Sequence, residues 1–182
     1  MYFKRWTPAP YHQKSIEPPW VQWTHHSEGK THCPECLALD GCFFHQGKAP
    51  TWPHHPYCHC TLEEVPYAVV WANASAYSDY SKFDPYLFDP ENFYKHGKNR
   101  AFESWGYSIS DSLWLKAEME KQALEKYLSG EYALGKLDKY GQHISIHIEI
   151  PRKDRSGTVS FLSGWMVKPN GKLKLNTPYG GK

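Results

Sequence analysis

The sequence predicts an α+β fold, in which a small cysteine-rich module precedes a compact domain of helices followed by a small antiparallel sheet. Two close pairs of cysteines lie in the first third of the chain, and a strong helical period follows in its second half. After that helix, isoleucine occupies every second position from residue 144 to residue 150, which is the alternation of a strand with one buried face. With 40% hydrophobic residues, the composition excludes a disordered chain.

The longest predicted helix begins after Asp111, a favoured capping residue, and ends at Gly130. Its apolar positions have near-helical spacing and are Leu113, Ala117, Leu124 and Leu128. A short helix is predicted to start at Asp89 and to be interrupted at Gly97, and a second one spans residues 98–105.

Three strands are predicted after these helices, at residues 143–150, 158–167 and 172–177. The last two are joined by a Pro-Asn-Gly hairpin turn. The isoleucines of the first strand are expected in the core, and Trp165 of the second strand with them. The opposite face of the first strand carries His143, Ser145, His147 and Glu149.

Composition divides the chain into four parts. Residues 1–32 are predicted to be an irregular arm, 33–65 a metal-binding module, 66–82 a linker, and 83–182 the α+β domain. From residue 81 onward there are sixteen Lys and Arg against twelve Asp and Glu, a mild positive excess that suits an RNA ligand without demanding one.

Four of the five cysteines form a metal-binding pattern rather than a disulfide framework. In Cys33-Pro-Glu-Cys36 a tight turn lets two thiolates converge on one ion, and Cys58 with Cys60 supplies the second half of a tetrahedral zinc site. His55 is the alternative fourth ligand, and two adjacent disulfides or free buried thiols are the competing interpretation. Because either ligand set fills the coordination sphere, the predicted Zn²⁺ is structural.

Cys42 lies outside both pairs and is expected to be a small buried side chain. No apolar run approaches the roughly 20 residues of a membrane helix, and the first residues lack the apolar core of a signal peptide. We therefore expect no membrane partner and no export signal. The metal-type spacing of the cysteine pairs leads us to expect a reducing compartment during folding.

The cysteine-rich segment resembles the C-terminal metal-binding end of phage Mu F-like minor head proteins. The shared elements are Cys-Pro-x-Cys at residues 33–36, Leu-Asp-Gly at 39–41 and His-Pro-x-Cys-x-Cys at 55–60. The resemblance implies phage head or portal proteins as partners. The large helical region that precedes this module in the family is not present in residues 1–32, so we expect a fragment or a stand-alone tail gene product.

The C-terminal domain resembles an uncharacterised bacterial and phage domain through motifs at residues 87–91, 97–107 and 177–180 and through Trp165. The last motif departs from the pattern, because glycine at position 180 replaces a proline. In phages, Mu F-like proteins often continue into toxin-like domains of the barnase, EndoU, colicin and RelE nuclease group, which also have helices followed by a small antiparallel sheet. Metal-independent ribonucleases of this group act on the open face of the sheet.

Such an enzyme needs a base, an acid and a cation for the phosphorane charge. His143 and His147 share the polar strand face about 13 Å apart, and histidine exchanges protons near neutral pH. Lys98, Thr177 and Tyr179 are the further catalytic candidates, with Lys174 as a reserve.

We therefore expect a phage- or prophage-associated toxin-like effector with a metal-independent ribonuclease in residues 83–182. It would be virion-associated or in the bacterial cytoplasm, with RNA as substrate and an immunity protein as a further partner. The alternative is a non-enzymatic virion structural protein that binds head or portal proteins through its zinc module, with the histidine face as a contact surface.

Overall fold

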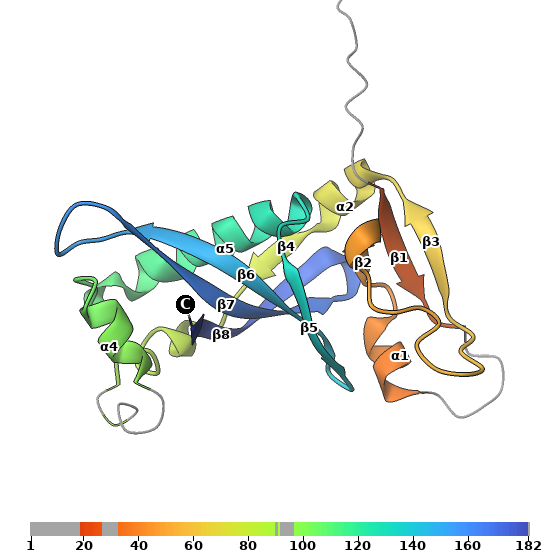
Figure 1. Ribbon diagram of the computed structural model, residues 1–182, viewed down its shortest axis with the longest axis horizontal. Coiled ribbons are helices and arrows are strands. Elements are labelled where there is room, and N and C mark those ends of the chain that lie inside the picture. The colour runs from red at the N-terminus through yellow and green to blue at the C-terminus, as the bar shows by residue number, and fades with distance from the viewer. Residues whose placement is uncertain (1–18, 27–32, 90, 92–96, 182) are drawn as a thin grey trace, which may run out of the picture.

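The computed structural model describes residues 19–26, 33–89, 91 and 97–181, which form two sheets and four α-helices (Figure 1). The small sheet has the strand order β2-β1-β3 and the large one β4-β8-β7-β6-β5. The helices are α1 (Pro34–Leu39), α2 (Tyr67–Asn73), α4 (Lys98–Glu103) and α5 (Ser112–Leu128). The strands are β1 (Trp20–Thr24), β2 (Phe43–His45), β3 (Thr61–Val65), β4 (Ser75–Tyr77), β5 (Ala133–Asp138), β6 (Gly141–Pro151), β7 (Thr158–Lys168) and β8 (Lys172–Gly181). The α+β prediction is confirmed, and the C-terminal region is mostly sheet.

The large sheet is antiparallel from β5 to β8, and β4 adds to its edge in parallel with β8. Ile144, Ile146, Ile148 and Ile150 are all buried, so the predicted isoleucine face is in the core. Trp165 on the neighbouring strand is fully buried on the same side, as expected. Strand β5, which the sequence pattern did not reveal, pairs with β6 and forms the other edge.

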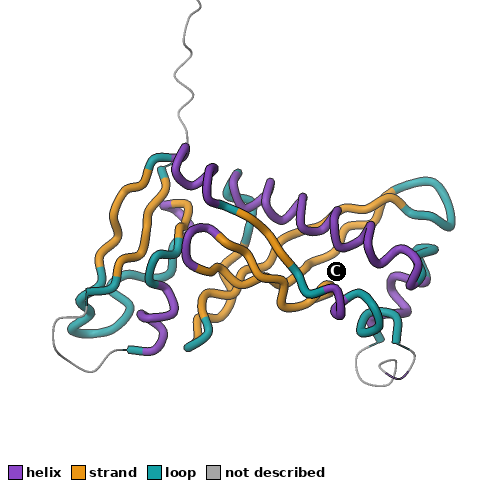
Figure 2. The backbone as a smooth tube through the Cα atoms, turned by 180° about the vertical axis from the view of Figure 1, so that it is seen from behind, coloured by secondary structure: helices purple, strands orange, loops and turns teal. Residues whose placement is uncertain are grey.

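Helix α5 lies along the isoleucine face of the large sheet (Figures 1 and 2). Its buried apolar residues are Leu115, Met119, Ala123 and Tyr127, each four positions after the last. The predicted apolar stripe is therefore wrong in its first half, where Leu113 is 69% exposed and Ala117 is exposed, whereas Leu128 in its second half packs against the core. Successive residues four apart stay on one helix face, so a stripe that begins two residues later faces a different direction.

The small sheet takes its central strand from the segment that we predicted as an irregular arm. Strand β1 pairs with β2 on one side and β3 on the other, and Trp20 and Trp23 are buried. The rest of that arm prediction, residues 1–18 and 27–32, lies outside the described residues, as does most of the short helix expected after Asp89. The predicted linker, residues 66–82, contains α2, β4 and a 3₁₀-helix. None of the helices described is long and apolar enough to cross a membrane.

The cysteine-rich module and the large sheet share one hydrophobic core. The buried Tyr127 hydroxyl of α5 donates to the Phe43 carbonyl of β2 at 2.6 Å, and the Tyr127 ring packs edge-on against Trp20 at 5.1 Å. Gly130, at φ +75°, lets the end of α5 pass close to the ring of His45, which would lie 3.0 Å from an added Cβ. The two predicted parts therefore pack as parts of a single core.

Replacing Tyr127 with phenylalanine should weaken this junction by about 1–2 kcal/mol, because it removes a buried hydroxyl donor and keeps the ring. Denaturant unfolding of the full chain measures the change. Tyr140→Phe is the matched control, since Tyr140 is 61% exposed and its loss should cost less than about 0.5 kcal/mol. Equal, negligible effects would contradict the importance of the Tyr127 hydrogen bond.

Candidate functional site

Cysteine and histidine side chains gather where α1 meets the loop before β3. The sulfur and nitrogen atoms of Cys33, Cys36 and His55 lie within 4.8 Å of one another, and so do the sulfurs of Cys36, Cys58 and Cys60. Cys36 belongs to both groups. All four predicted zinc ligands and the alternative ligand therefore surround one position that can hold a structural metal such as zinc.

Local structure explains this convergence. Cys33 is the N-cap of α1 and Pro34 occupies its first turn, so Cys36 follows on the same short helix and is buried. The second half is a loop in which Tyr57 has a positive φ of 62° and is 92% exposed. A residue other than glycine in this conformation bends the chain sharply. The bend brings Cys58 to 3.8 Å from Cys36, sulfur to sulfur.

His55 is oriented as a metal ligand would be. Its Nδ1 lies 2.8 Å from the Pro56 carbonyl, which can only accept a hydrogen bond. The proton is therefore on Nδ1, and Nε2 presents its lone pair 3.4 Å from the Cys36 sulfur. A carbonyl that fixes the tautomer in this way is typical of zinc-bound histidine. Five donors thus surround four coordination positions, and the choice between His55 and a fourth cysteine stays open.

The chemistry of the donors also fits a cation. Burial raises the pKa of the Cys36 thiol, and the neighbouring thiols Cys60, Cys58 and Cys33 raise it further. Several thiolates cannot share so small a volume without an opposing charge, and a bound Zn²⁺ supplies that charge. A further group, Cys33 with Glu35 and His54, has no buried member and is the weaker donor set.

Cys42 stands apart from this cluster, as predicted. Its sulfur approaches the carbonyls of Ala38 and Val167 instead, and burial raises its pKa to about 12. A thiol so firmly protonated is inert.

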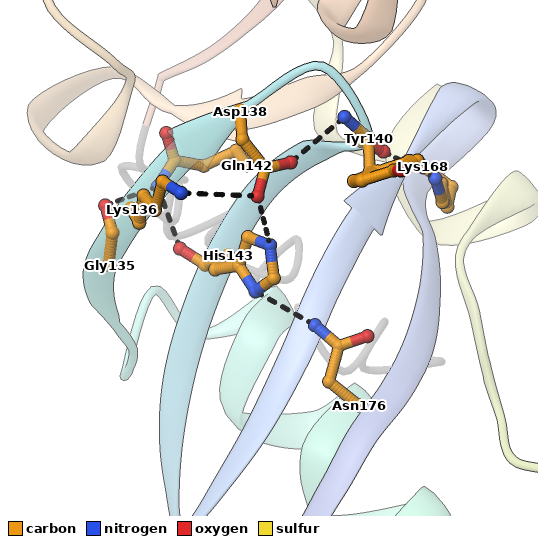
Figure 3. Close-up of polar contacts among 8 residues, drawn as sticks. All are labelled: Gly135, Lys136, Asp138, Tyr140, Gln142, His143, Lys168 and Asn176. Carbon is orange, nitrogen blue, oxygen red and sulfur yellow. Dashed lines mark hydrogen bonds and ion pairs between the residues drawn. The ribbon is translucent and has the colours of Figure 1, made fainter.

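A second polar cluster lies on the open face of the large sheet and is centred on His143 (Figure 3). The Asn176 amide nitrogen lies 2.9 Å from His143 Nδ1, and Asp138 Oδ2 lies 3.2 Å from Nε2. An amide nitrogen only donates, so Nδ1 holds the lone pair and Nε2–H donates to Asp138. The Tyr140 N–H lowers the pKa of Asp138 most, and His143 lowers it further. Asp138 is thus a carboxylate that orients the ring.

Lys98 of α4 approaches β8, the strand that carries Asn176. Its ammonium group donates to the Thr177 hydroxyl at 2.6 Å, and that hydroxyl donates to the Tyr179 carbonyl at 3.0 Å. Burial lowers the pKa of Lys98, and the nearby Lys82 lowers it further. Lys82 itself donates to the Asn176 carbonyl at 2.9 Å. The two lysines therefore reach adjacent residues of β8.

An irregularity in β8 gives the adjacent residues Asn176 and Thr177 their separate partners, His143 and Lys98. Gly164 of β7 pairs with Thr177, whereas the next residue, Trp165, pairs with Leu175. Asn176 is thus the extra residue of a β-bulge, a device that re-aims side chains next to functional sites. The bulge turns the Asn176 amide toward His143 while Thr177 faces Lys98.

Comparison with known families identifies the region that contains His143, Lys98 and their partners on β8. One family model matches residues 72–182, more than half of the chain, and is described as Domain of unknown function (DUF6883). The chain belongs to this DUF6883 family. No curated protein and no solved structure gives a significant match. The DUF6883 region holds the whole large sheet with α4 and α5, and the metal centre lies outside it.

The DUF6883 region brings some of the predicted catalytic residues together and separates others. Lys98 bonds to Thr177, and His143 bonds to the preceding residue of β8, Asn176. His147 lies in a separate pocket further along β6. The Tyr179 ring packs against Phe102, Trp105 and Phe161 at centroid distances of 5.9–6.2 Å, so it has a packing role here. Lys174 points toward Asp79 at 3.8 Å.

Sequence reasoning missed three members of the cluster: Lys82, Asp138 and Asn176. Lys82 lay in the presumed linker, and Asp138 lay in a strand that was not predicted. Neither has a local signal, because each is defined by a partner far away in the sequence. Asn176 is inside the predicted last strand, but only the bulge gives it a role.

Proposed function

We propose that this chain is a phage- or prophage-associated toxin-like effector whose DUF6883 domain cleaves RNA without a catalytic metal. The observation that carries the proposal is that a half-buried lysine pair and an oriented histidine bond to two adjacent residues of β8, Asn176 and Thr177. Lys98 and Lys82 offer positive charge, and His143 is held by a carboxylate in a defined tautomer. Those are the groups that phosphodiester cleavage requires.

The proposed reaction is attack of a ribose 2′-oxygen on its own 3′-phosphate. The O2′–P bond forms, the P–O5′ bond breaks, and the products are a 2′,3′-cyclic phosphate and a free 5′-hydroxyl. A base takes the 2′-OH proton, and an acid returns one to O5′. No oxidant, reductant or metal takes part in this step.

His143 is the proposed base. Its Nδ1 lone pair accepts from the Asn176 amide, so a ribose hydroxyl that displaces this amide would donate to the same lone pair. Asp138 would hold the ring in the required tautomer and stabilise the imidazolium that forms, as the carboxylate of a catalytic triad does. The Asn176 amide then occupies the position that the ribose hydroxyl of the substrate would take.

Lys98 is the proposed cation and acid. Its Nζ donates to the Thr177 hydroxyl and lies 5.7 Å from the centre of the Tyr86 ring, in a half-buried setting where its charge would interact strongly with a phosphate. Because burial lowers its pKa, it also releases a proton more readily than an ordinary lysine. Zinc has no part in the chemistry: bound by Cys33, Cys36 and two of the three donors His55, Cys58 and Cys60, it would have a filled coordination sphere.

We further propose that the module contacts phage head or portal proteins and that an immunity protein covers the RNA-binding face. The support for the first is the resemblance of residues 33–60 to the Mu F-like module. The support for the second is only the proposed toxicity.

Lys98→Ala should lower the rate of RNA cleavage by the full chain at least about 100-fold, because it removes the transition-state cation. Cleavage of a labelled single-stranded RNA with no added divalent ion measures this. Lys121→Ala, an exposed lysine on α5, is the control that should keep the full rate. The rate should also fall as pH rises through the lowered pKa of Lys98, below the 10.5 of an ordinary lysine.

His143→Ala should lower the rate comparably, and the thermal melt of each variant shows whether it is folded. A folded wild-type chain that leaves RNA intact would contradict the proposal and favour the non-enzymatic virion protein. Activity that appears only with added Mg²⁺ or Mn²⁺ would contradict the metal-independent mechanism.

A further inference from the structure

A pocket lies beside the proposed catalytic cluster, further along β6. It has a volume of about 510 Å³ and contains His147. Its walls come from three places: Lys48 of the cysteine-rich module, the end of α5 with the residues that follow it, and the open face of β6 and β7. Drug-sized ligands occupy pockets of roughly 300–1,000 Å³, so a single nucleotide is of suitable size.

Two lysines give this pocket its positive charge. The Lys48 ammonium group donates to the Tyr132 carbonyl at 2.8 Å and lies 5.5 Å from the centre of the Tyr132 ring. An ammonium has three N–H donors, so two remain for a ligand. Lys126 lies in the last turn of α5 and lines the same pocket.

The remaining lining is too varied for a simple anion site. Glu131 contributes a carboxylate, which accepts a hydrogen bond from Ser129 at 2.9 Å. Ser145 adds a hydroxyl, and Leu162 adds an apolar surface. A ligand that matches all of these has an anionic group for the lysines, a donor edge for the carboxylate and a flat body for the apolar wall. A nucleotide has these three features.

The pocket is also correctly placed to extend the proposed active site. Ser145, Gly164 and Thr177 pair across β6, β7 and β8 in one row, and His147 pairs with Leu162 one row further on. Gly164 has no side chain, and a Cβ there would come within 2.9 Å of Thr177. The Thr177 side chain thus lies over Gly164, on the face that carries Ser145 and His147, and strand spacing puts the Cα atoms of His147 and Thr177 about 12 Å apart.

We propose that this pocket binds one nucleotide of a single-stranded polynucleotide next to the cleavage site, with Lys48 and Lys126 at the phosphate. The proposal rests on the proposed ribonuclease function. It adds a structural consequence: since Lys48 belongs to the cysteine-rich module, that module contributes directly to substrate binding. His147 would contact the bound nucleotide rather than take the 2′-OH proton.

Titration of the full chain with uridine 3′-monophosphate, followed by NMR and calorimetry, tests the proposal. We expect amide shifts at Ala133, Ser145 and Leu162, and at least tenfold weaker binding in Lys126→Ala and Lys48→Ala. Lys121→Ala again removes one charge from α5 outside the pocket and should bind as the wild type does. Because the amide shifts are measured on unaltered protein, a variant that fails to fold does not decide the result.

Three outcomes would overturn the proposal: equal binding by Lys126→Ala and Lys121→Ala, shifts that lie elsewhere, or inorganic phosphate binding as tightly as the nucleotide. The assay does not depend on catalysis, so the two proposals fail separately. Nucleotide binding here without RNA cleavage would reject only the ribonuclease. RNA cleavage without nucleotide binding here would reject only the pocket.

Discussion

Cys36→Ser is expected to reduce zinc from one ion per chain to none and to unfold residues 33–60. Cys36 is chosen because it belongs to both clusters of possible ligands. Structural zinc contributes on the order of 10 kcal/mol or more to a small module, which is comparable with the whole stability of a typical domain. Native mass spectrometry measures the metal content, and circular dichroism measures the melt.

The shared core extends this effect beyond the module. Tyr127 of α5 bonds to Phe43 and packs on Trp20, so loss of the module would expose part of the core of the large sheet. We therefore expect the melting temperature of the entire chain to fall, rather than a local change alone. Chelation of zinc from the wild-type chain should give the same result.

Cys42→Ala is the matched control, since Cys42 is a buried cysteine outside the metal cluster. It should keep one zinc ion and lose only about 1–2 kcal/mol of stability. Full zinc content in Cys36→Ser, or two disulfides among the four cysteines of a freshly reduced preparation, would contradict the metal centre.

The metal cluster was predictable because its signal is local. Two thiolates in a tight turn must point the same way, and a second pair some twenty residues later can complete the site. The fourth ligand could not be chosen, because it depends on how the loop at Tyr57 folds. Even with the loop folded, five donors surround four positions.

The helix after Asp111 was predicted correctly as an element, but the side of it that faces the core was not. Two sets of apolar residues exist along α5, one starting at Leu113 and the other at Leu115, and local periodicity favours neither decisively. The buried set ends at Tyr127, whose hydroxyl needs the Phe43 carbonyl as its partner. A contact between residues 84 positions apart leaves no trace in a local pattern.

The small sheet was missed for a similar reason. Strand β1 is only five residues long, in a segment rich in proline and tryptophan, and its partners β2 and β3 come from much later in the chain. Such a strand is defined by pairing rather than by its own sequence. The open-face cluster likewise depends on the Asn176 bulge, which only the pairing of β7 with β8 reveals.

Ile146→Asn should lower the free energy of unfolding by about 3–6 kcal/mol, whereas His147→Asn should change it by less than about 0.5 kcal/mol. Ile146 has no exposed surface and packs in the core under α5, while His147 is its exposed neighbour on β6. Asparagine at position 146 both removes apolar contacts and buries an amide that lacks a partner. Denaturant unfolding of the two variants measures the difference.

The comparison is sharp because the same residue is introduced at adjacent positions of one strand. The low β-strand propensity of asparagine affects both variants equally, so only the direction of the side chain distinguishes them. Equal destabilisation would mean that something packs on the His147 face, and the pocket proposed there would then be closed. A stable Ile146→Asn protein would instead contradict the isoleucine core on which the whole arrangement of β6, β7 and α5 rests.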